Sequence, residues 1–256
     1  MKATITQMNA SQLENDWARL QAHIAAERSD LLLLPEMCFA PWFCVARQFD
    51  SQVWDGAVAA HEGWLERLYE PGAGIVVGTA PRNLAGRRIN SAYCWTREGG
   101  LTWIHSKTYL PRDEGYWEAD WYQRAPIGFQ PTRIGGLRIG LMICTEIWFF
   151  QHAREYGRQG VQLLLHPRCT PLPTNDKWLA GGRTAAVVAG AYCLSSNHAG
   201  QANQMELGGA GWICEPDGEA LATTSSQQPF VTLELDLQLA DAAKSTYPRY
   251  VDDSEI

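Results

Sequence analysis

The sequence predicts an α/β fold in which two β-sheets pack face to face and helices cover their outer sides. Strand-like and helical stretches alternate through all 256 residues. About twelve strand-like runs accompany about four helices, and two packed sheets accommodate that number better than one open sheet does. The chain has no internal repeat, low-complexity tract or obvious linker. We therefore expect one domain that spans residues 1–256.

The N-terminal half is expected to begin with a strand at Lys2–Met8. A capping box at Ser11–Glu14 then predicts a helix that continues to about Arg28. The segment from Thr108 to Pro131 has neither periodicity and is expected to be irregular. The other elements predicted in this half are a buried strand at Asp30–Leu34, a helix at Gln52–Tyr69 ended by Pro71-Gly72, and strands at Ile75–Ala80, Ile89–Thr96 and Leu101–Ser106.

The C-terminal half continues the alternation of strands and helices. Its most apolar run, Leu137–Ile143, is expected to be a buried strand that leads into a helix at Glu146–Gln159. A second helix is predicted at Thr174–Ala189, and the tail after the last strand is expected to be irregular. The other predicted strands are Thr132–Ile134, Val161–His166, Tyr192–Ser196, Gly211–Cys214, Glu219–Ala222 and Val231–Leu235.

Composition and charge narrow the class of protein. Hydrophobic residues make up 46% and charged residues 19%, which excludes a disordered chain or a coiled coil. The net charge of −7, with no basic run longer than Arg87-Arg88, argues against nucleic acid as a partner. The chain shows neither a signal peptide nor an apolar run of the ~20 residues that a membrane span needs. Seven scattered cysteines without a C-x-x-C pair suit a reducing compartment. We expect a cytoplasmic protein with no membrane partner.

Three polar residues follow apolar runs in a way that suggests chemistry. Glu36 follows Leu31–Pro35, Lys107 follows Leu101–Ser106, and Cys144 ends the run Leu137–Ile143. Strand ends of this kind border the ligand crevice of open α/β sheets. A cysteine between a strand and a helix is expected to be a thiolate stabilised by backbone N–H groups and the helix dipole. Taken singly, each residue also fits a structural role, as a buried thiol, a cap or a solvated lysine.

The segments around these three residues resemble the nitrilase (carbon–nitrogen hydrolase) superfamily. The resemblance covers essentially the whole chain, with the three segments in the family's order and spacing. It implies a four-layer α/β/β/α sandwich, a homodimer or larger assembly, and a reaction that needs neither metal nor organic cofactor. The segments that carry it are Leu33–Glu36, His105–Pro111 and Gly140–Glu146, continued by Arg183–Ala186, Asn197 and Glu215–Gly218.

Carried over by position, the resemblance makes Cys144 the nucleophile, Glu36 the general base and Lys107 the electrostatic partner. Glu118 would be a second active-site glutamate, as in members that cleave carbamoyl amines, although Glu114 is an alternative. A thiolate attacks a poorly electrophilic amide carbon better than water does. Lys107 and the backbone N–H of Thr145 would hold the oxyanion, each donor contributing ~3 kcal/mol.

The substrate is less well determined by the sequence. Trp42, Trp117 and Trp148 lie close to the three segments and would line an apolar pocket, or would simply pack in the core or a subunit interface. Arg168 follows a strand and would either meet a substrate carboxylate or face solvent. Glu146 resembles nitrile-cleaving members, whereas the segment from Lys107 to Glu118 favours amides and carbamoyl compounds. The second resemblance covers more residues, so we expect a small amide or N-carbamoyl substrate.

Several alternatives compete with this assignment. A nitrile-hydrolysing enzyme and a catalytically silent binding protein of the same fold both remain open. Many members have a proline–glutamate pair where this chain has Phe150-Gln151, which would change a helix start without removing a catalytic residue. The six histidines form neither His-x-His nor His-Glu-x-x-His, so a zinc amidohydrolase is disfavoured and no metal site is expected.

Overall fold

The computed structural model describes residues 1–125 and 128–252. The α-helices are α1 (Leu13–Glu27), α2 (Ser51–Leu65), α3 (Glu118–Trp121), α4 (Phe150–Arg158), α5 (Asn175–Ala189) and α6 (Leu237–Ala243), and the 3₁₀ helices are η1 (Ala10–Gln12), η2 (Cys144–Trp148) and η3 (Leu172–Thr174). The strands are β1 (Lys2–Met8), β2 (Leu31–Leu33), β3 (Ile75–Leu84), β4 (Arg87–Thr96), β5 (Gly100–Ser106), β6 (Thr132–Ile134), β7 (Leu137–Leu141), β8 (Leu163–Arg168), β9 (Tyr192–Ala202), β10 (Met205–Gly208), β11 (Trp212–Cys214), β12 (Ala220–Thr223) and β13 (Phe230–Glu234).

The strands form two sheets that are joined along one line. The first sheet has the order β13-β1-β2-β3-β4-β5, and its central strands β1, β2 and β3 are parallel. The second has the order β6-β7-β8-β9-β11-β12, with β7, β8 and β9 parallel. The ends of β1 and β9 pair through Gln7 with Asn197 and Met8 with His198, so one hydrogen-bonded path connects the sheets.

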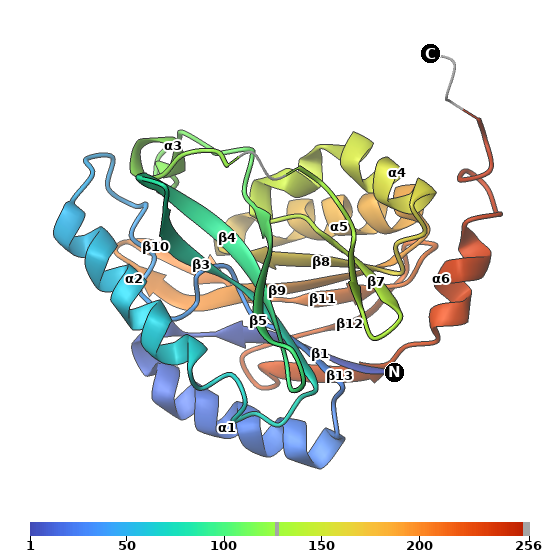
Figure 1. The fold of residues 1–256 in the computed structure, drawn as a ribbon, viewed down its shortest axis with the longest axis horizontal. Coiled ribbons are helices and arrows are strands. Elements are labelled where there is room, and N and C mark those ends of the chain that lie inside the picture. Colours follow the sequence, from blue (N-terminus) through green and yellow to red (C-terminus); the bar gives the residue numbers. More distant parts are fainter. Residues whose placement is uncertain (126–127, 253–256) are drawn as a thin grey trace.

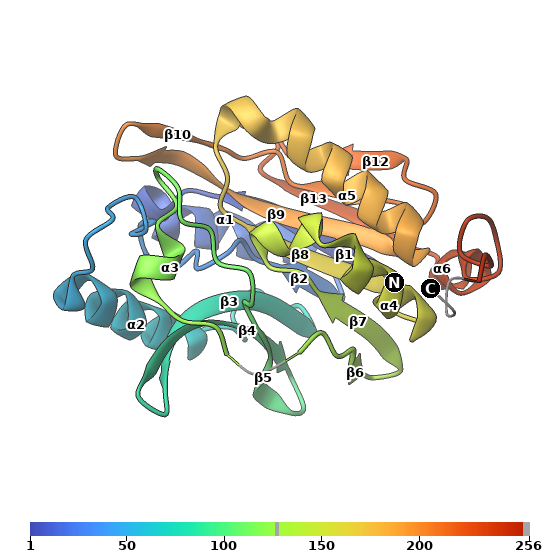
Figure 2. The same cartoon turned by 90° about the horizontal axis from the view of Figure 1, so that it is seen from above.

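Side-chain alternation along the strands produces the four layers. Leu31 and Leu33 of β2 pack in the core between the sheets, whereas Leu32 and Leu34 pack against the α1 side. On β8, Leu163 faces the other sheet and Leu164 packs under α4 and α5. Figures 1 and 2 show α1 and α2 on one side of the molecule and α4 and α5 on the other. The predicted α/β/β/α sandwich of two packed sheets is confirmed.

Some predicted boundaries were wrong, for local reasons. Ser11 does not cap α1, because the Asn9 side chain accepts the Ser11 N–H and residues 10–12 form η1 instead. The hairpin of β3 and β4 extends four residues past Ala80, with a turn at Ala85-Gly86 in which both residues have positive φ. The helix predicted from Gln52 begins at Ser51, after an Asp50 cap, and ends at Leu65.

Short elements appear where the sequence predicted irregular chain or a loop. Within the segment Thr108–Pro131, α3 forms a single turn, and α6 occupies part of the expected irregular tail. The strand predicted at Tyr192–Ser196 continues to Ala202 and pairs with β10, which was not predicted. Residues 126–127 and 253–256 of those two expected irregular segments lie outside the described residues.

Candidate active site

Cys144 lies at the sharp turn that follows β7. Its φ of 46° is a left-handed conformation that is uncommon for a residue with a side chain, and it turns the chain from the strand into η2. The predicted helix start at Glu146 was wrong, because α4 begins at Phe150 and its dipole does not end at the thiol. Burial and the nearby Glu36 raise the pKa of the Cys144 thiol, which favours the neutral thiol over the thiolate that the sequence predicted.

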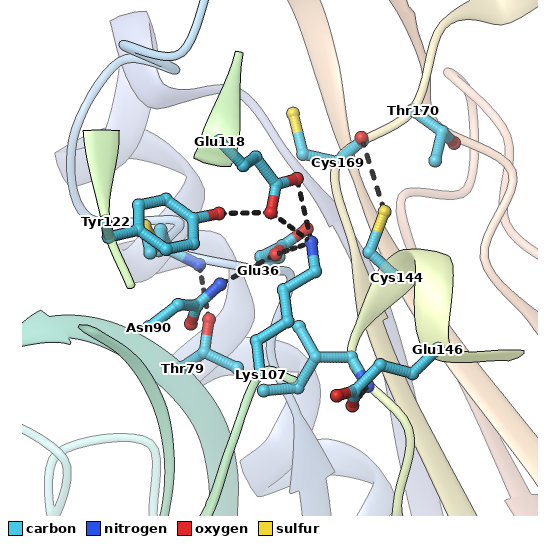
Figure 3. A network of polar contacts seen from close by, with 12 residues as sticks. Glu36, Thr79, Asn90, Lys107, Glu118, Tyr122, Cys144, Glu146, Cys169 and Thr170 are labelled. Atoms are coloured by element: carbon cyan, nitrogen blue, oxygen red, sulfur yellow. Dashed lines mark hydrogen bonds and ion pairs between the residues drawn. The ribbon is translucent and has the colours of Figure 1, made fainter. Parts of the chain in front are cut away.

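Three charged side chains meet beside this thiol, all of them almost inaccessible to solvent (Figure 3). The Nζ of Lys107 lies 2.8 Å from Glu36 Oε1 and 2.8 and 2.6 Å from the two carboxylate oxygens of Glu118. The Cys144 Sγ points to the carbonyl oxygen of Cys169 at 3.8 Å. The topology thus brings together residues that are up to 108 positions apart in the chain, counted from Glu36 to Cys144.

Electrostatics inside the cluster keep Lys107 protonated. Burial alone would lower the pKa of Lys107, but the carboxylates of Glu118 and Glu36 raise it well above its ordinary value. Burial raises the pKa of Glu118 to about 7, against the opposing effect of Lys107. Two carboxylates and one ammonium therefore share a site in which Glu118 changes its charge near neutral pH.

Two residues that sequence reasoning missed hold the glutamates in place. The side-chain amide of Asn90 donates to Glu36 Oε1 at 2.8 Å. The backbone carbonyl of Asn90 accepts the backbone N–H of Lys107 at 2.9 Å. The hydroxyl of Tyr122 donates to Glu118 Oε2. Tyr122 stands four positions after Glu118, a helical spacing that the sequence contains. Asn90 lies within a strand, where no local pattern distinguishes it.

Three buried oxygens at this site have no hydrogen-bonding partner among the described residues: Glu36 Oε2, Asn90 Oδ1 and the Tyr116 hydroxyl. Burial, together with the proximity of Cys169 and Cys144, raises the pKa of Tyr116 and marks it as a neighbour of the thiol. Buried polar atoms are usually satisfied, so these three oxygens are available to hydrogen-bond a bound molecule.

The remaining predicted residues occupy different positions. Glu118 lies at the cluster, whereas Glu114 is exposed, which separates the two candidates for the second glutamate. Trp42 is buried, donates to the Gly115 carbonyl at 3.0 Å and packs on the Tyr116 ring. Trp117 is half-buried, with the guanidinium of Arg47 5.0 Å from its ring. Thr145 is half-buried, as the second residue of η2.

The side chains of Trp148 and Arg168 are both held by contacts with other parts of the chain. The Trp148 ring packs against Trp178 and Gly181 of α5, as a core residue would. Arg168 is fully buried, so the expectation of a solvent-facing arginine was wrong. Its three nitrogens donate to the Ser195 and Thr170 hydroxyls and to the carbonyls of Gly209 and Ala210. The predicted contact of Arg168 with a substrate carboxylate stays a prediction, although the guanidinium already binds the loop around it.

A large apolar groove lies near the site but does not contain the charged cluster. Its volume is about 930 Å³, and Trp42 and Trp121 line it together with the segment from Phe39 to Asp50 and part of α2. Neither Cys144 nor Glu36, Lys107 or Glu118 lines this groove. Trp42 both lines the groove and packs on the Tyr116 ring.

Residues 1–125 and 128–252 contain neither a cluster of metal-binding side chains nor a membrane-spanning helix. Within these ranges, no three His, Cys, Asp or Glu side chains are grouped as a metal ion would require. None of the helices in the same ranges is long and apolar enough to cross a membrane.

Sequence comparison places the chain among known hydrolases. Residues 2–245 match the profile described as carbon-nitrogen hydrolase. The chain is 23% identical to 2-oxoglutaramate amidase of Bacillus subtilis, over 89% of this chain and 86% of the relative. It is also 23% identical to N-carbamoylputrescine amidase of Arabidopsis thaliana, over 90% and 83% of the two chains. A nitrilase of Pyrococcus abyssi has the same identity, over 93% and 91%.

Solved structures share the fold at lower identity. A carbon-nitrogen hydrolase from Helicobacter pylori superimposes with a TM-score of 0.85 at 18% identity, covering 100% of this chain and 96% of that one. The NitN amidase from Nesterenkonia sp. AN1 gives a TM-score of 0.79 at 18% identity, covering 98% of each chain. One variant of that amidase, with a TM-score of 0.75 at 18% identity over 93% of this chain and 95% of that one, carries acrylamide added to its active-site cysteine.

Proposed function

The chain belongs to the carbon-nitrogen hydrolase family and acts on C–N bonds other than peptide bonds, and from this premise we propose that it hydrolyses a small amide or N-carbamoyl compound through a thioester at Cys144. The observation that carries the proposal is the unpartnered Glu36 Oε2 in a buried site whose thiol is neutral. A neutral thiol needs a base, and Glu36 has one carboxylate oxygen left to accept its proton.

The acylation half-reaction uses each member of the cluster. Glu36 takes the proton from Cys144 as the sulfur attacks the carbonyl carbon, and the carbonyl electrons move to its oxygen. The Lys107 ammonium, which Glu36 and both oxygens of Glu118 hold beside the thiol, donates to this oxyanion together with the Thr145 N–H. The intermediate then collapses, the C–N bond breaks, and the proton on Glu36 passes to the departing nitrogen. Ammonia or an amine leaves.

Deacylation uses the same groups, with water as the attacking molecule. Glu36 takes a proton from water, the resulting hydroxide attacks the thioester carbon, and Lys107 holds the second oxyanion. The C–S bond breaks, the thiolate recovers the proton from Glu36, and the acid leaves. Glu118 and Tyr122 keep the Lys107 ammonium in place throughout, since their hydrogen bonds do not involve the reacting atoms.

The test is release of ammonia or amine from a panel of primary amides, N-carbamoyl amines and nitriles. Cys144→Ala is expected to lower kcat by at least about 10⁴-fold, because no other group supplies the nucleophile. Cys193→Ala is the matched control, since that buried thiol lies in the core under α4 and α5 and should affect stability alone.

Each outcome distinguishes the candidates. Full activity in Cys144→Ala would contradict the mechanism. A clear preference for nitriles would favour the nitrilase alternative instead. Failure of every compound in the panel, together with no covalent adduct on Cys144 by mass spectrometry, would indicate a binding protein.

A further inference from the structure

A third buried carboxylate beside the site, that of Glu146, connects the segment that carries Lys107 to the one that carries Cys144. Its Oε1 accepts the backbone N–H of Thr108 at 2.7 Å, and its Oε2 accepts the backbone N–H of Ile143 at 2.8 Å. The His105 ring Nε2 also donates to Oε2, at 2.8 Å. Thr108 follows Lys107 and Ile143 precedes Cys144, so one side chain binds the neighbours of both groups.

The strands that precede Lys107 and Cys144 are not hydrogen-bonded to each other. β5 is the first strand of the hydrogen-bonded path and lies in one sheet, whereas β7 is near its far end and lies in the other. Among the described residues, no strand pairing joins them. Lys107 and Cys144 therefore face each other across the space between two sheets, and side chains must fix their separation.

We propose that Glu146 is a positioning residue that sets the place of the Lys107 ammonium relative to the Cys144 sulfur. This role rests on the proposed function, in which Lys107 holds the oxyanion that forms when Cys144 attacks. A displacement of about 1 Å between such groups can slow a reaction about 100-fold. Glu146 does not touch the reacting atoms itself, since both carboxylate oxygens are taken by Thr108, Ile143 and His105.

The hydrogen-bond pattern makes Glu146→Gln a sharp test. Glutamine has the same shape, so it preserves the packing, but one of its two terminal groups is a donor. An NH₂ in the place of Oε1 faces the Thr108 N–H, and an NH₂ in the place of Oε2 faces the Ile143 N–H. Either placement breaks the connection to one of the two segments. His105 does not force the choice, because its Nδ1 has no partner among the described residues and the ring can change tautomer.

Two covalent probes separate positioning from simple loss of structure. Methyl vinyl ketone adds to a thiol at its β-carbon: the S–C bond forms, the thiol proton goes to the base, and the electrons move onto the carbonyl oxygen before the α-carbon is protonated. Lys107 stabilises that charge. 2-Iodoethanol alkylates the same sulfur with loss of iodide and builds no oxyanion. Neither probe contains an amide that the enzyme can hydrolyse.

The experiment measures the rate at which each probe modifies Cys144, by mass spectrometry of the intact protein and of the Cys144 peptide. Glu146→Gln is expected to slow ketone addition by about 100-fold and alkylation by less than about 5-fold. Glu146→Asp keeps both acceptor oxygens but withdraws them by one methylene from their three donors, so it should show the same difference. It replaces Glu146→Gln if the latter does not fold.

The control is Asp16→Asn, which alters another buried carboxylate that accepts a backbone N–H, from Asn9, far from the site. It is expected to lower stability and leave both rates unchanged. Equal slowing of both probes in the Glu146 variants, or no slowing of either, would overturn the positioning role. A wild-type Cys144 no more reactive than free cysteine toward both probes would instead overturn the proposed function, and this role with it.

Discussion

At the scale of single residues, Glu118 is the group whose charge responds to pH. Its pKa rises from 4.5 to about 7 on burial. Between these two pH values the folded protein keeps a proton that the unfolded chain has lost, so the free energy of unfolding falls as the pH rises. Below pH 4.5 both states are protonated and the effect is absent, and above pH 7 it is complete.

Glu118→Gln removes this titration. The stability of the wild type relative to the variant is expected to fall by about 3 kcal/mol between pH 4.5 and 7, and to stay level above pH 7. Chemical denaturation of both proteins across this range measures the difference. Glu114→Gln is the control, because that exposed carboxylate should change stability by less than about 0.5 kcal/mol at any pH. A difference that grows above pH 7, or does not change at all, would contradict the assignment.

The residues of the site were predictable to different degrees. Glu36, Lys107 and Cys144 each follow a strand-like run, and their convergence was inferred from the resemblance rather than from spacing. Arg168 follows a strand in the same way, yet its guanidinium binds the surrounding loop. Local sequence does not distinguish a strand end that faces the site from one that is packed under it, since that depends on which strands become neighbours.

At the scale of elements, predictions succeeded where a long apolar run decided the structure. β1, β7, β8 and α5 lie within about two residues of their predicted bounds. The missed elements, α3, α6 and β10, have four to seven residues and little periodicity. Such short segments fold because neighbours hold them: β10 pairs with the end of β9, and α3 is fixed by Glu118 and Tyr122.

Substitutions at two helical glycines test how closely the helices pack against their neighbours. A Cβ at Gly157 of α4 would lie 2.7 Å from the Ala189 carbonyl oxygen of α5, whereas a Cβ at Gly56 of α2 would have no neighbour within 4 Å. Gly157→Ala is therefore expected to destabilise the protein by about 1–3 kcal/mol. Gly56→Ala should stabilise it by about 1 kcal/mol through helix propensity. Urea denaturation of both variants tests the contrast, and the same sign of change for both would refute the close contact between α4 and α5.

At the scale of the whole molecule, the two sheets create the site by facing each other. Glu36 and Lys107 follow strands of the first sheet, and Cys144 follows a strand of the second. In the proposed mechanism the base and the cation are thus carried by one layer and the nucleophile by the other. A change in the packing of the sheets would then alter the geometry of the reaction, and this is why the proposal gives a positioning role to Glu146, whose carboxylate binds segments of both layers.

The cysteines are distributed over the packed layers of this sandwich, so their reactivity shows which layers are accessible. All seven are buried and free, and burial raises the pKa of each thiol. Cys38 lies in the core under α1, Cys94 between the sheets, and Cys193 under α4 and α5. Only Cys144 is expected to react, because Glu36 supplies the base that a neutral buried thiol needs.

Native protein treated with iodoacetamide should therefore be labelled at Cys144 alone, and guanidinium chloride should expose all seven thiols. Peptide mapping of the labelled protein gives the result directly. Cys44 and Cys169 are the most informative comparison with Cys144, because they lie in the same electrostatic environment. The nearby Glu118 and Glu36 raise the pKa of both thiols further. If either is labelled as fast as Cys144, reactivity follows access to the site rather than proton transfer to Glu36. If Cys38 or Cys193 is labelled in the native state, the layer that covers it opens without global unfolding.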